Sequence, residues 1–227
     1  MLSLLVCLWL VQAAGWTAPR REDFGVICEA QKFEVGVEIG VQVAVFSEHV
    51  LTHWRSNKRY YLVDMWRQQS NYSDGANVNN DEQEKKYQIA QRRMKRFAEK
   101  TVFMRNDSLS AALLVPDDSV DFIYVDARHD YCGVTEDLFA WWPKLKKGGL
   151  LAGHDFFTAD EYIAYLGAYR KEGDDWGLCG NGSYHRGAVK GAVLDFARRV
   201  NVSEDSVKQT GHVKNAFPSW YFPPKGS

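Results

Sequence analysis

The segment from Asp121 to Phe156 constrains the fold more than any other part of the sequence. Its residue pattern predicts a short buried strand over Phe122–Val125, then a helix, a turn over Lys146–Gly149, and a second strand that starts at Leu150–Ala152. A strand–helix–strand unit of this kind almost always forms a right-handed crossover between parallel strands. The sequence therefore predicts an α/β protein built on a mostly parallel sheet.

The helix inside this unit is predicted from apolar residues at near-helical spacing. Its inner face would carry Val134, Leu138, Trp141 and Leu145. Pro143 has no backbone donor and is expected to close the helix.

Acidic and histidine side chains follow both strands of the unit. Asp126 and His129 come after the first strand, and His154 and Asp155 come after the second. The carboxyl ends of parallel strands meet at one edge of the sheet, where open α/β sheets bind their ligands. We therefore expect these four side chains to converge on a site.

The remaining pattern extends this unit to a doubly wound, Rossmann-like sheet, mostly parallel and closed by a C-terminal antiparallel hairpin. Further strands are predicted over Phe33–Ile39, Tyr60–Val63 and Thr101–Met104, and the hairpin over Ser206–Val213 and Ala216–Phe222. Further helices are predicted over Ser47–Trp54, Glu82–Lys100, Ser110–Leu114 and Gly187–Val200, and Thr158–Ser183 is expected to be irregular.

Each of the earlier strands also ends in polar residues. Glu38 and Gly40 form an acidic-x-Gly turn without the later glycines of a dinucleotide fingerprint, which suits a cofactor that lacks phosphates and offers an amino group. Asp64 is placed to accept hydrogen bonds from both hydroxyls of a ribose, although a helix cap or solvated turn explains one aspartate equally well. Asp107 and Ser108 end the third strand, where an adenine edge would lie.

A long polar and aromatic loop over Met65–Asp81 follows Asp64. Loops of this length in a compact domain are usually functional or disordered. We interpret it as a pocket lid that contains Trp66 and Tyr72.

Composition limits the class of protein. The 227 residues are 45% hydrophobic and 25% charged, and suit one soluble domain. A net charge of -1 gives no reason to expect a nucleic-acid partner, and a local basic cluster around Lys85–Arg96 has the spacing of a solvated helix face.

The N-terminal residues Met1–Ala14 are apolar, too short to cross a bilayer comfortably, and end in small residues. They resemble the core and cleavage region of a secretory signal but lack its positively charged start. We predict a signal peptide or membrane anchor over residues 1–18 and one domain over residues 19–227. A short buried or membrane-lying helix and the remnant of a longer N-terminal region are the alternatives.

Two further patterns bear on the compartment. Glycosylation motifs occur at Asn71, Asn106, Asn181 and Asn201, although a glycan on Asn106 would obstruct the predicted pocket. Of the four cysteines, removal of the leader leaves three, which form at most one disulfide or stay reduced and buried. Together with the N-terminus, these patterns favour the secretory pathway or a membrane anchor over the cytoplasm.

The order of these motifs resembles a class I S-adenosylmethionine-dependent methyltransferase. The chain is most similar to the small-molecule O-methyltransferase branch grouped as methyltransferase family 24, over nearly everything after about Phe33. The matching segments are residues 37–42 (VEIGVQ), 61–66 (YLVDMW), 121–131 (DFIYVDARHDY), 142–155 (WPKLKKGGLLAGHD), 187–193 (GAVKGAV) and 218–222 (PSWYF).

The resemblance assigns roles to the cofactor side of the site. Glu38 and Gly40 would hold the methionine end of S-adenosylmethionine, Asp64 its ribose, and Asp107 and Ser108 its adenine. Asp126 completes this cofactor-binding set.

The resemblance also extends to metal-assisted O-methyltransferases. In that pattern Asp126, His154 and Asp155 would bind magnesium or manganese, and His129 would act as the base. His154 replaces an acidic residue of the family pattern, which weakens the case for magnesium because that ion prefers oxygen ligands. A surface histidine, or one that only orients Asp126, is the alternative for His129.

The resulting hypothesis is methyl transfer to a hydroxyl of a small molecule such as a sugar, a phenol or another secondary metabolite. A non-catalytic Rossmann-like binding domain and an NAD-type oxidoreductase are the rival functions, and the missing GxGxxG disfavours the second. The expected partner is the small-molecule acceptor. Membrane contact is expected only through an N-terminal anchor, and a homo-oligomer is compatible with the sequence.

Overall fold

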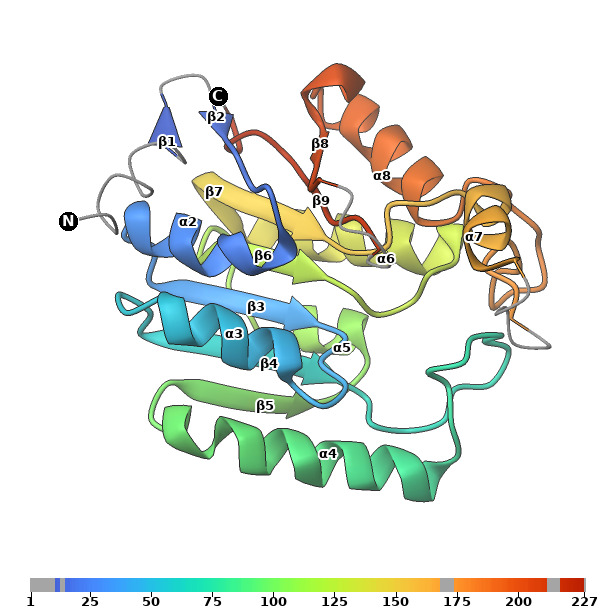
Figure 1. Ribbon diagram of the computed structural model, residues 1–227, viewed down its shortest axis with the longest axis horizontal. Helices are drawn as coiled ribbons and strands as arrows, with labels where there is room; N and C mark the ends of the chain where they lie inside the picture. Colours follow the sequence, from blue (N-terminus) through green and yellow to red (C-terminus); the bar gives the residue numbers. More distant parts are fainter. Residues whose placement is uncertain (1–10, 13–14, 168–173, 212–216, 227) are drawn as a thin grey trace.

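The computed structural model describes residues 11–12, 15–167, 174–211 and 217–226. Within these residues seven strands form one sheet in the order β5-β4-β3-β6-β7-β9-β8 (Figure 1). Five strands run parallel: β3 (Val35–Ile39), β4 (Arg59–Asp64), β5 (Thr101–Arg105), β6 (Val120–Val125) and β7 (Leu145–Gly153). The short strands β9 (Trp220–Tyr221) and β8 (Lys208–Gln209) add to β7 in antiparallel fashion. The predicted doubly wound sheet with antiparallel C-terminal strands is confirmed, and residues 212–216 of the predicted hairpin lie outside the described residues.

Helices cover both faces of this sheet. Side chains of α2 (Phe24–Ala30), α3 (Val45–His53) and α4 (Asn80–Met94) pack into one core cluster, and α2 and α3 lie in front of the sheet in Figure 1. Side chains of α5 (Ser108–Ala112), α6 (Tyr131–Trp141) and α8 (Ala188–Arg199) pack into the cluster on the other face. Short 3-10 turns are η1 (Arg21–Asp23), η2 (Lys95–Phe97), η3 (Trp142–Lys144) and η5 (Glu204–Ser206).

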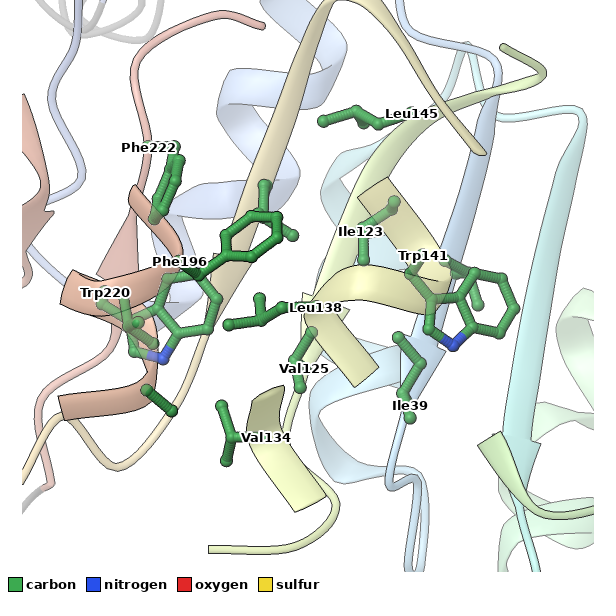
Figure 2. Close-up of a cluster of buried hydrophobic side chains, with 14 of the residues drawn as sticks. Ile39, Ile123, Val125, Val134, Leu138, Trp141, Leu145, Phe196, Trp220 and Phe222 are labelled. Carbon is green, nitrogen blue, oxygen red and sulfur yellow. The ribbon is translucent and has the colours of Figure 1, made fainter. Parts of the chain in front are cut away.

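The central strand β6 shows why the sheet needs both layers. All of its residues are buried: Phe122 and Tyr124 belong to one cluster, and Ile123 and Val125 to the other. Figure 2 shows Ile123 and Val125 among the side chains of α6, α8 and β9. A parallel strand buried on both faces reads as a continuous apolar run, which explains why this strand is visible in the sequence.

The topology fixes where a ligand can bind. Strand β3 pairs with β4 on one side and with β6 on the other. The chain runs from β3 to α3 on one face of the sheet and from β6 to α6 on the other face. The crevice at such a switch point is the usual ligand site of open α/β sheets. In Figure 1 the parallel strands point to the right, toward α7 and the loop between β4 and α4.

The N-terminal segment is built into the domain. Trp16 and Ala18 are buried, the Ala18 amide donates to the Tyr221 hydroxyl, and Pro19 accepts from the Gly211 amide. Residues 1–10 and 13–14 of the predicted leader lie outside the described residues, while β1 (Val11–Gln12) and β2 (Gly15–Trp16) form a separate two-stranded ribbon. No helix among the described residues is long and apolar enough to cross a membrane.

The predicted boundary between α6 and β7 is wrong. Leu145, expected on the helix, begins β7, and the expected turn at Lys146–Gly149 lies inside that strand. Leu145 pairs with Val120 across a register shift, and the Lys146 ammonium lies 2.8 Å from a buried Asp121 carboxylate oxygen. These long-range contacts extend the strand across the two glycines, against their local preference for a turn.

The segment Thr158–Ser183 is also more regular than expected. Its first part is helix α7 (Ala159–Leu166), which begins with a capping box between Thr158 and Glu161.

A disulfide joins this insert to helix α6. Cys132, in the first turn of α6, is bonded to Cys179, so the sequence-based alternative of one disulfide is the one that the structure adopts. Cys28 is buried as a thiol, and Cys7 lies outside the described residues.

Candidate active site

A cavity of about 570 Å³ opens at the carboxyl ends of the parallel strands. It lies at the switch point between β3 and β6, and its size is typical of a small-molecule site. Every site residue predicted from the sequence contributes to its lining: Glu38, Gly40, Asp64, Asp107, Ser108, Asp126, His129, His154 and Asp155. The structure therefore brings the whole predicted set together, while the role of each residue stays a prediction.

Gly40 allows β3 and β6 to meet at this cavity. Its φ is +89°, a conformation that side chains rarely adopt, and a Cβ atom there would overlap the carbonyl oxygen of Asp126. The Asp126 amide in turn donates to the Ile39 carbonyl at 2.7 Å. Glycine is thus required by the close approach of two strand ends, and not only by a ligand.

Glu38 is a buried carboxyl group on the cofactor side. One of its oxygens accepts hydrogen bonds from the Ser47 hydroxyl at 2.6 Å and the Tyr60 hydroxyl at 3.2 Å. Burial raises the pKa of Glu38 to about 8, although these bonds and the positive charge of Arg21 oppose the shift. The amino group of a bound ligand would favour the ionised form of Glu38. The predicted contact of Glu38 with the methionine end of the cofactor requires that form.

This pKa predicts how stability depends on pH. The folded state keeps the Glu38 proton up to about pH 8, whereas the unfolded chain releases it near its ordinary value, so the folded state binds more protons between these limits. The stability of the wild type should therefore fall across this window as pH rises. We expect the stability of Glu38→Gln, relative to that of the wild type, to increase by about 4 kcal/mol between acid pH and pH 8, at about 1.4 kcal/mol per pKa unit. Melting curves at acid and alkaline pH measure this, and a difference that does not change with pH would contradict it.

Asp64 already accepts several hydrogen bonds from the backbone, apart from any contact with a ribose. Its carboxylate accepts from the backbone amides of Val41, Gln42 and Trp66 at 2.7–3.0 Å. Because a carboxylate has about four acceptor sites, about one remains for a ribose hydroxyl. Asp64 therefore also shapes the turn after β3, and its contact with both ribose hydroxyls stays a prediction.

Only one of the two aromatic residues of the predicted lid lies at the cavity. Tyr72 lines the cavity, but Trp66 is 1% exposed and packs against Tyr87 and Phe103. The Trp66 indole donates to the Gln42 carbonyl at 2.7 Å. Trp66 is thus a core residue, and its placement in a pocket lid is wrong.

Asp107 and Ser108 line the cavity and also serve the local structure. The Asp107 carboxylate caps α5 by accepting from the Ser110 amide, and the Ser108 hydroxyl accepts from the Trp141 indole at 2.9 Å. Both interactions account for these residues without a ligand, so their contact with adenine stays a prediction.

Asp126, His154 and Asp155 form a compact cluster on the acceptor side. Each offers a potential metal-ligand atom, and these atoms lie within 4.8 Å of one another. Burial alone would raise the pKa of Asp155, but His154 and His129 outweigh it and hold that pKa below its ordinary value. Its Oδ1 is buried without a suitably directed hydrogen-bond donor, although His154 Nδ1 lies 2.9 Å away.

Arg21 decides whether this cluster suits a divalent metal. Its Nη2 donates to Asp126 Oδ2 at 2.8 Å, and its Nη1 lies 3.4 Å from His154 Nε2. A divalent ion bound by these atoms would have to displace the guanidinium, because the two cations repel each other and compete for Asp126. With Arg21 in this position, the three residues do not fit a divalent metal.

His129 lies between two carboxylates. Its Nδ1 is 2.8 Å from Asp74 and its Nε2 is 3.0 Å from Asp155, while its ring packs against Trp176. Burial would lower the pKa of His129, but Tyr72, Asp155 and Asp74 outweigh it and raise that pKa well above its ordinary value. The structure therefore favours the imidazolium, which has to lose a proton before it can act as the predicted base.

Sequence reasoning missed Arg21, Asp74 and Trp176. Asp74 accepts from both His129 and the Trp176 indole at 2.8 Å, so it ties the loop after β4 to the insert after α7. These residues lie in irregular or N-terminal segments without periodicity. The only usable signal was the unusual length of the loop that contains Asp74.

Comparison with known proteins adds the family. Residues 33–156 match the family model of methyltransferase family 24, described as a methyltransferase domain. No curated protein matches the chain.

Solved structures share the fold at low sequence identity. An O-methyltransferase from Bacillus cereus in complex with SAH has a TM-score of 0.55 at 14% identity, covering 99% of this chain and 88% of that one. An rRNA methylase from Streptococcus thermophilus has a TM-score of 0.53 at 12% identity, covering 92% and 97%. The N-methyltransferase NodS from Bradyrhizobium japonicum has a TM-score of 0.50 at 13% identity, covering 90% and 94%. Proteins with such different acceptors share this fold, so the fold does not identify the acceptor.

Proposed function

This chain belongs to methyltransferase family 24, and from that premise we propose that it transfers the methyl group of S-adenosylmethionine to a hydroxyl of a small molecule. Membership makes it an S-adenosylmethionine-dependent methyltransferase, while the acceptor is our proposal. The observation that carries the proposal is that the predicted cofactor and acceptor residues line one and the same cavity, between β3 and β6. Glu38, Gly40 and Asp64 line its cofactor side, and Asp126 and His129 line the side where an acceptor would lie.

The proposed chemistry needs positioning and the removal of one proton. The acceptor oxygen forms a bond to the methyl carbon while the carbon–sulfur bond breaks, which leaves S-adenosylhomocysteine, and the hydroxyl proton passes to a base. We assign His129 as that base when its Nε2 is deprotonated. Asp74 would hold the Nδ1 proton and orient the ring, as the carboxylate does in a serine-protease triad.

The metal-assisted form of the reaction is the alternative. A magnesium or manganese ion on Asp126, His154 and Asp155 would lower the pKa of the acceptor hydroxyl, but it requires Arg21 to leave Asp126. We therefore favour metal-independent transfer.

Thermal stability tests cofactor binding. We expect S-adenosylhomocysteine at about 100 times its Kd to stabilise the protein by about 2.7 kcal/mol, which raises the Tm by about 5–10 °C for a domain of this size. NAD should leave the Tm unchanged, because the turn at Gly40 has no dinucleotide fingerprint. A well-folded protein that responds to NAD and not to S-adenosylhomocysteine would sink the proposal.

The acceptor needs a direct screen. Sugars, phenols and carboxylic acids incubated with methyl-labelled cofactor would reveal the substrate class, and a hydroxyl acceptor is expected. Binding of the cofactor without transfer to any of these would favour the rival view of a non-catalytic binding domain.

We also propose that the protein works in the secretory pathway or at a membrane. The Cys132–Cys179 disulfide is typical of oxidising compartments, and the motif residues Asn71, Asn181 and Asn201 are exposed. Asn106 instead lines the cavity, where a glycan would block it. The proposed partner remains a small-molecule acceptor, without nucleic acid.

A further inference from the structure

We propose that Arg21 supplies the fixed positive charge of the acceptor site, in the place that the sequence pattern assigned to a divalent cation. The inference rests on the proposed methyl transfer and deepens it. In this view the guanidinium neutralises Asp126 and orients the acceptor oxygen, so that transfer needs no metal.

Arg21 is held in place from several sides. It starts η1, directly before α2, and the next buried residue, Phe24, packs against Phe122, Tyr124 and Tyr221. The preceding residues are fastened by the bonds of Ala18 and Pro19 to the C-terminal part of the chain. A side chain anchored on both sides is preorganised, which is the property that an electrostatic role requires.

The guanidinium itself lies over two aromatic rings. Its central carbon is 4.6 Å from the ring centroid of Phe46 and 5.3 Å from that of Tyr124, and these two rings stack on each other. Cation–π contacts of this kind hold a planar guanidinium in one orientation. The rings thereby aim Arg21 at Asp126 and His154.

The charges around the cavity explain why a cation is needed there. Asp126 and Asp155 line the cavity, and Asp74 lies 2.8 Å from His129. His129 contacts Asp74 and Asp155, and His154 Nδ1 lies 2.9 Å from Asp155, whereas the shortest ion-pair distance of Asp126 is the 2.8 Å to Arg21. The positive charge of Arg21 thus neutralises the negative charge of Asp126 without a metal. Its Nε is buried without a hydrogen-bond acceptor among the described residues, so a ligand oxygen would give that donor a partner.

Arg21 does not come from the part of the chain that carries the family resemblance. The family model begins at residue 33, so the segment that delivers Arg21 lies outside the matched region. The strand ends of this site resemble those of metal-assisted O-methyltransferases. Arg21, which comes from another segment, completes the site.

The test compares Arg21→Met with Arg20→Met. Methionine keeps much of the apolar stem and removes the charge, and Arg20 is a matched neighbour whose side chain is 62% exposed and pairs only with Asp23 among the ion pairs of the described residues. We expect Arg21→Met to lose methyl transfer by about 10²-fold or more, the usual effect of removing one preorganised donor. Arg21→Met should still bind S-adenosylhomocysteine, and Arg20→Met should behave as the wild type.

Manganese titration by calorimetry supplies a readout independent of activity. The wild type should not bind Mn²⁺, Arg21→Met should bind it, and the added change Asp155→Asn should remove that binding. Activity of the wild type should also be unaffected by EDTA. Mn²⁺ binding by the wild type equal to that of Arg21→Met, loss of wild-type activity in EDTA, or full activity of Arg21→Met would each overturn the inference.

Failure of the variant to fold and failure of the proposed function can each be recognised. If Arg21→Met does not fold, Mn²⁺ titration and EDTA treatment of the wild type decide the matter. If the wild type does not bind S-adenosylhomocysteine, the proposed function fails, and the role of Arg21 fails with it; if it binds, the arginine variants test the inference alone.

Discussion

Gly40→Ala is expected to destabilise the protein by at least about 3 kcal/mol, which lowers the Tm by about 6–12 °C for a domain of this size. The new Cβ would overlap the Asp126 carbonyl and also the backbone of Ala127, and neither strand end can yield without breaking the sheet. The turn that carries Val41 and Gln42 would shift as well, so binding of S-adenosylhomocysteine should be lost. Thermal melts with and without this ligand measure both effects.

Gly148→Ala is the matched control. Gly148 also has a positive φ, +78°, but a Cβ there would meet nothing within 4 Å. Gly148→Ala should lower the stability of the protein only by the strain of the left-handed conformation, about 1–2 kcal/mol, and should leave ligand binding intact. Equal losses of stability in the two variants would show that the contact with Asp126 is unimportant.

His129→Gln is expected to lower methyl transfer by about 10²–10⁴-fold, the usual contribution of a positioned acid–base group. Binding of S-adenosylhomocysteine should persist, because Glu38 and Asp64 lie on the other side of the cavity. The variant should also be less stable, since Asp74 and Asp155 lose the charge that they share. Turnover with labelled cofactor, ligand affinity and Tm separate the three effects.

His53→Gln provides the comparison for the same substitution at an exposed position on α3. It should leave both turnover and affinity unchanged. Full turnover in His129→Gln would remove His129 from the mechanism, and loss of affinity together with turnover would assign it to cofactor binding instead.

The sequence predicted the strand ends of this site well. Glu38, Asp64, Asp126 and Asp155 each follow an apolar run, and the rule that parallel strands end at one edge places them together. Local patterns failed where distant contacts outweigh them. Lys146–Gly149 reads as a turn but lies inside β7, where the pairing with β6 shifts register, and Trp66 reads as a lid residue but is buried against Phe103.

The partners of the acceptor side could not be predicted at all. Arg21 pairs with Asp126 across 105 positions, and Trp176 bonds to Asp74 across 102 positions. These residues lie in segments without periodicity, and their pairing depends on how the N-terminal segment and the insert pack on the sheet.

By itself, the sequence indicated the family through the resemblance of its spaced motifs. It also determined the doubly wound sheet and the carboxylates at its edge, because apolar periodicity and strand-end polarity are local properties of the chain. Only the tertiary structure decided how those carboxylates are neutralised. It set Arg21 on Asp126 and placed His129 between Asp74 and Asp155. The physical reason is that a buried charge needs a partner, and the fold, rather than proximity in the chain, selects which partner can reach it.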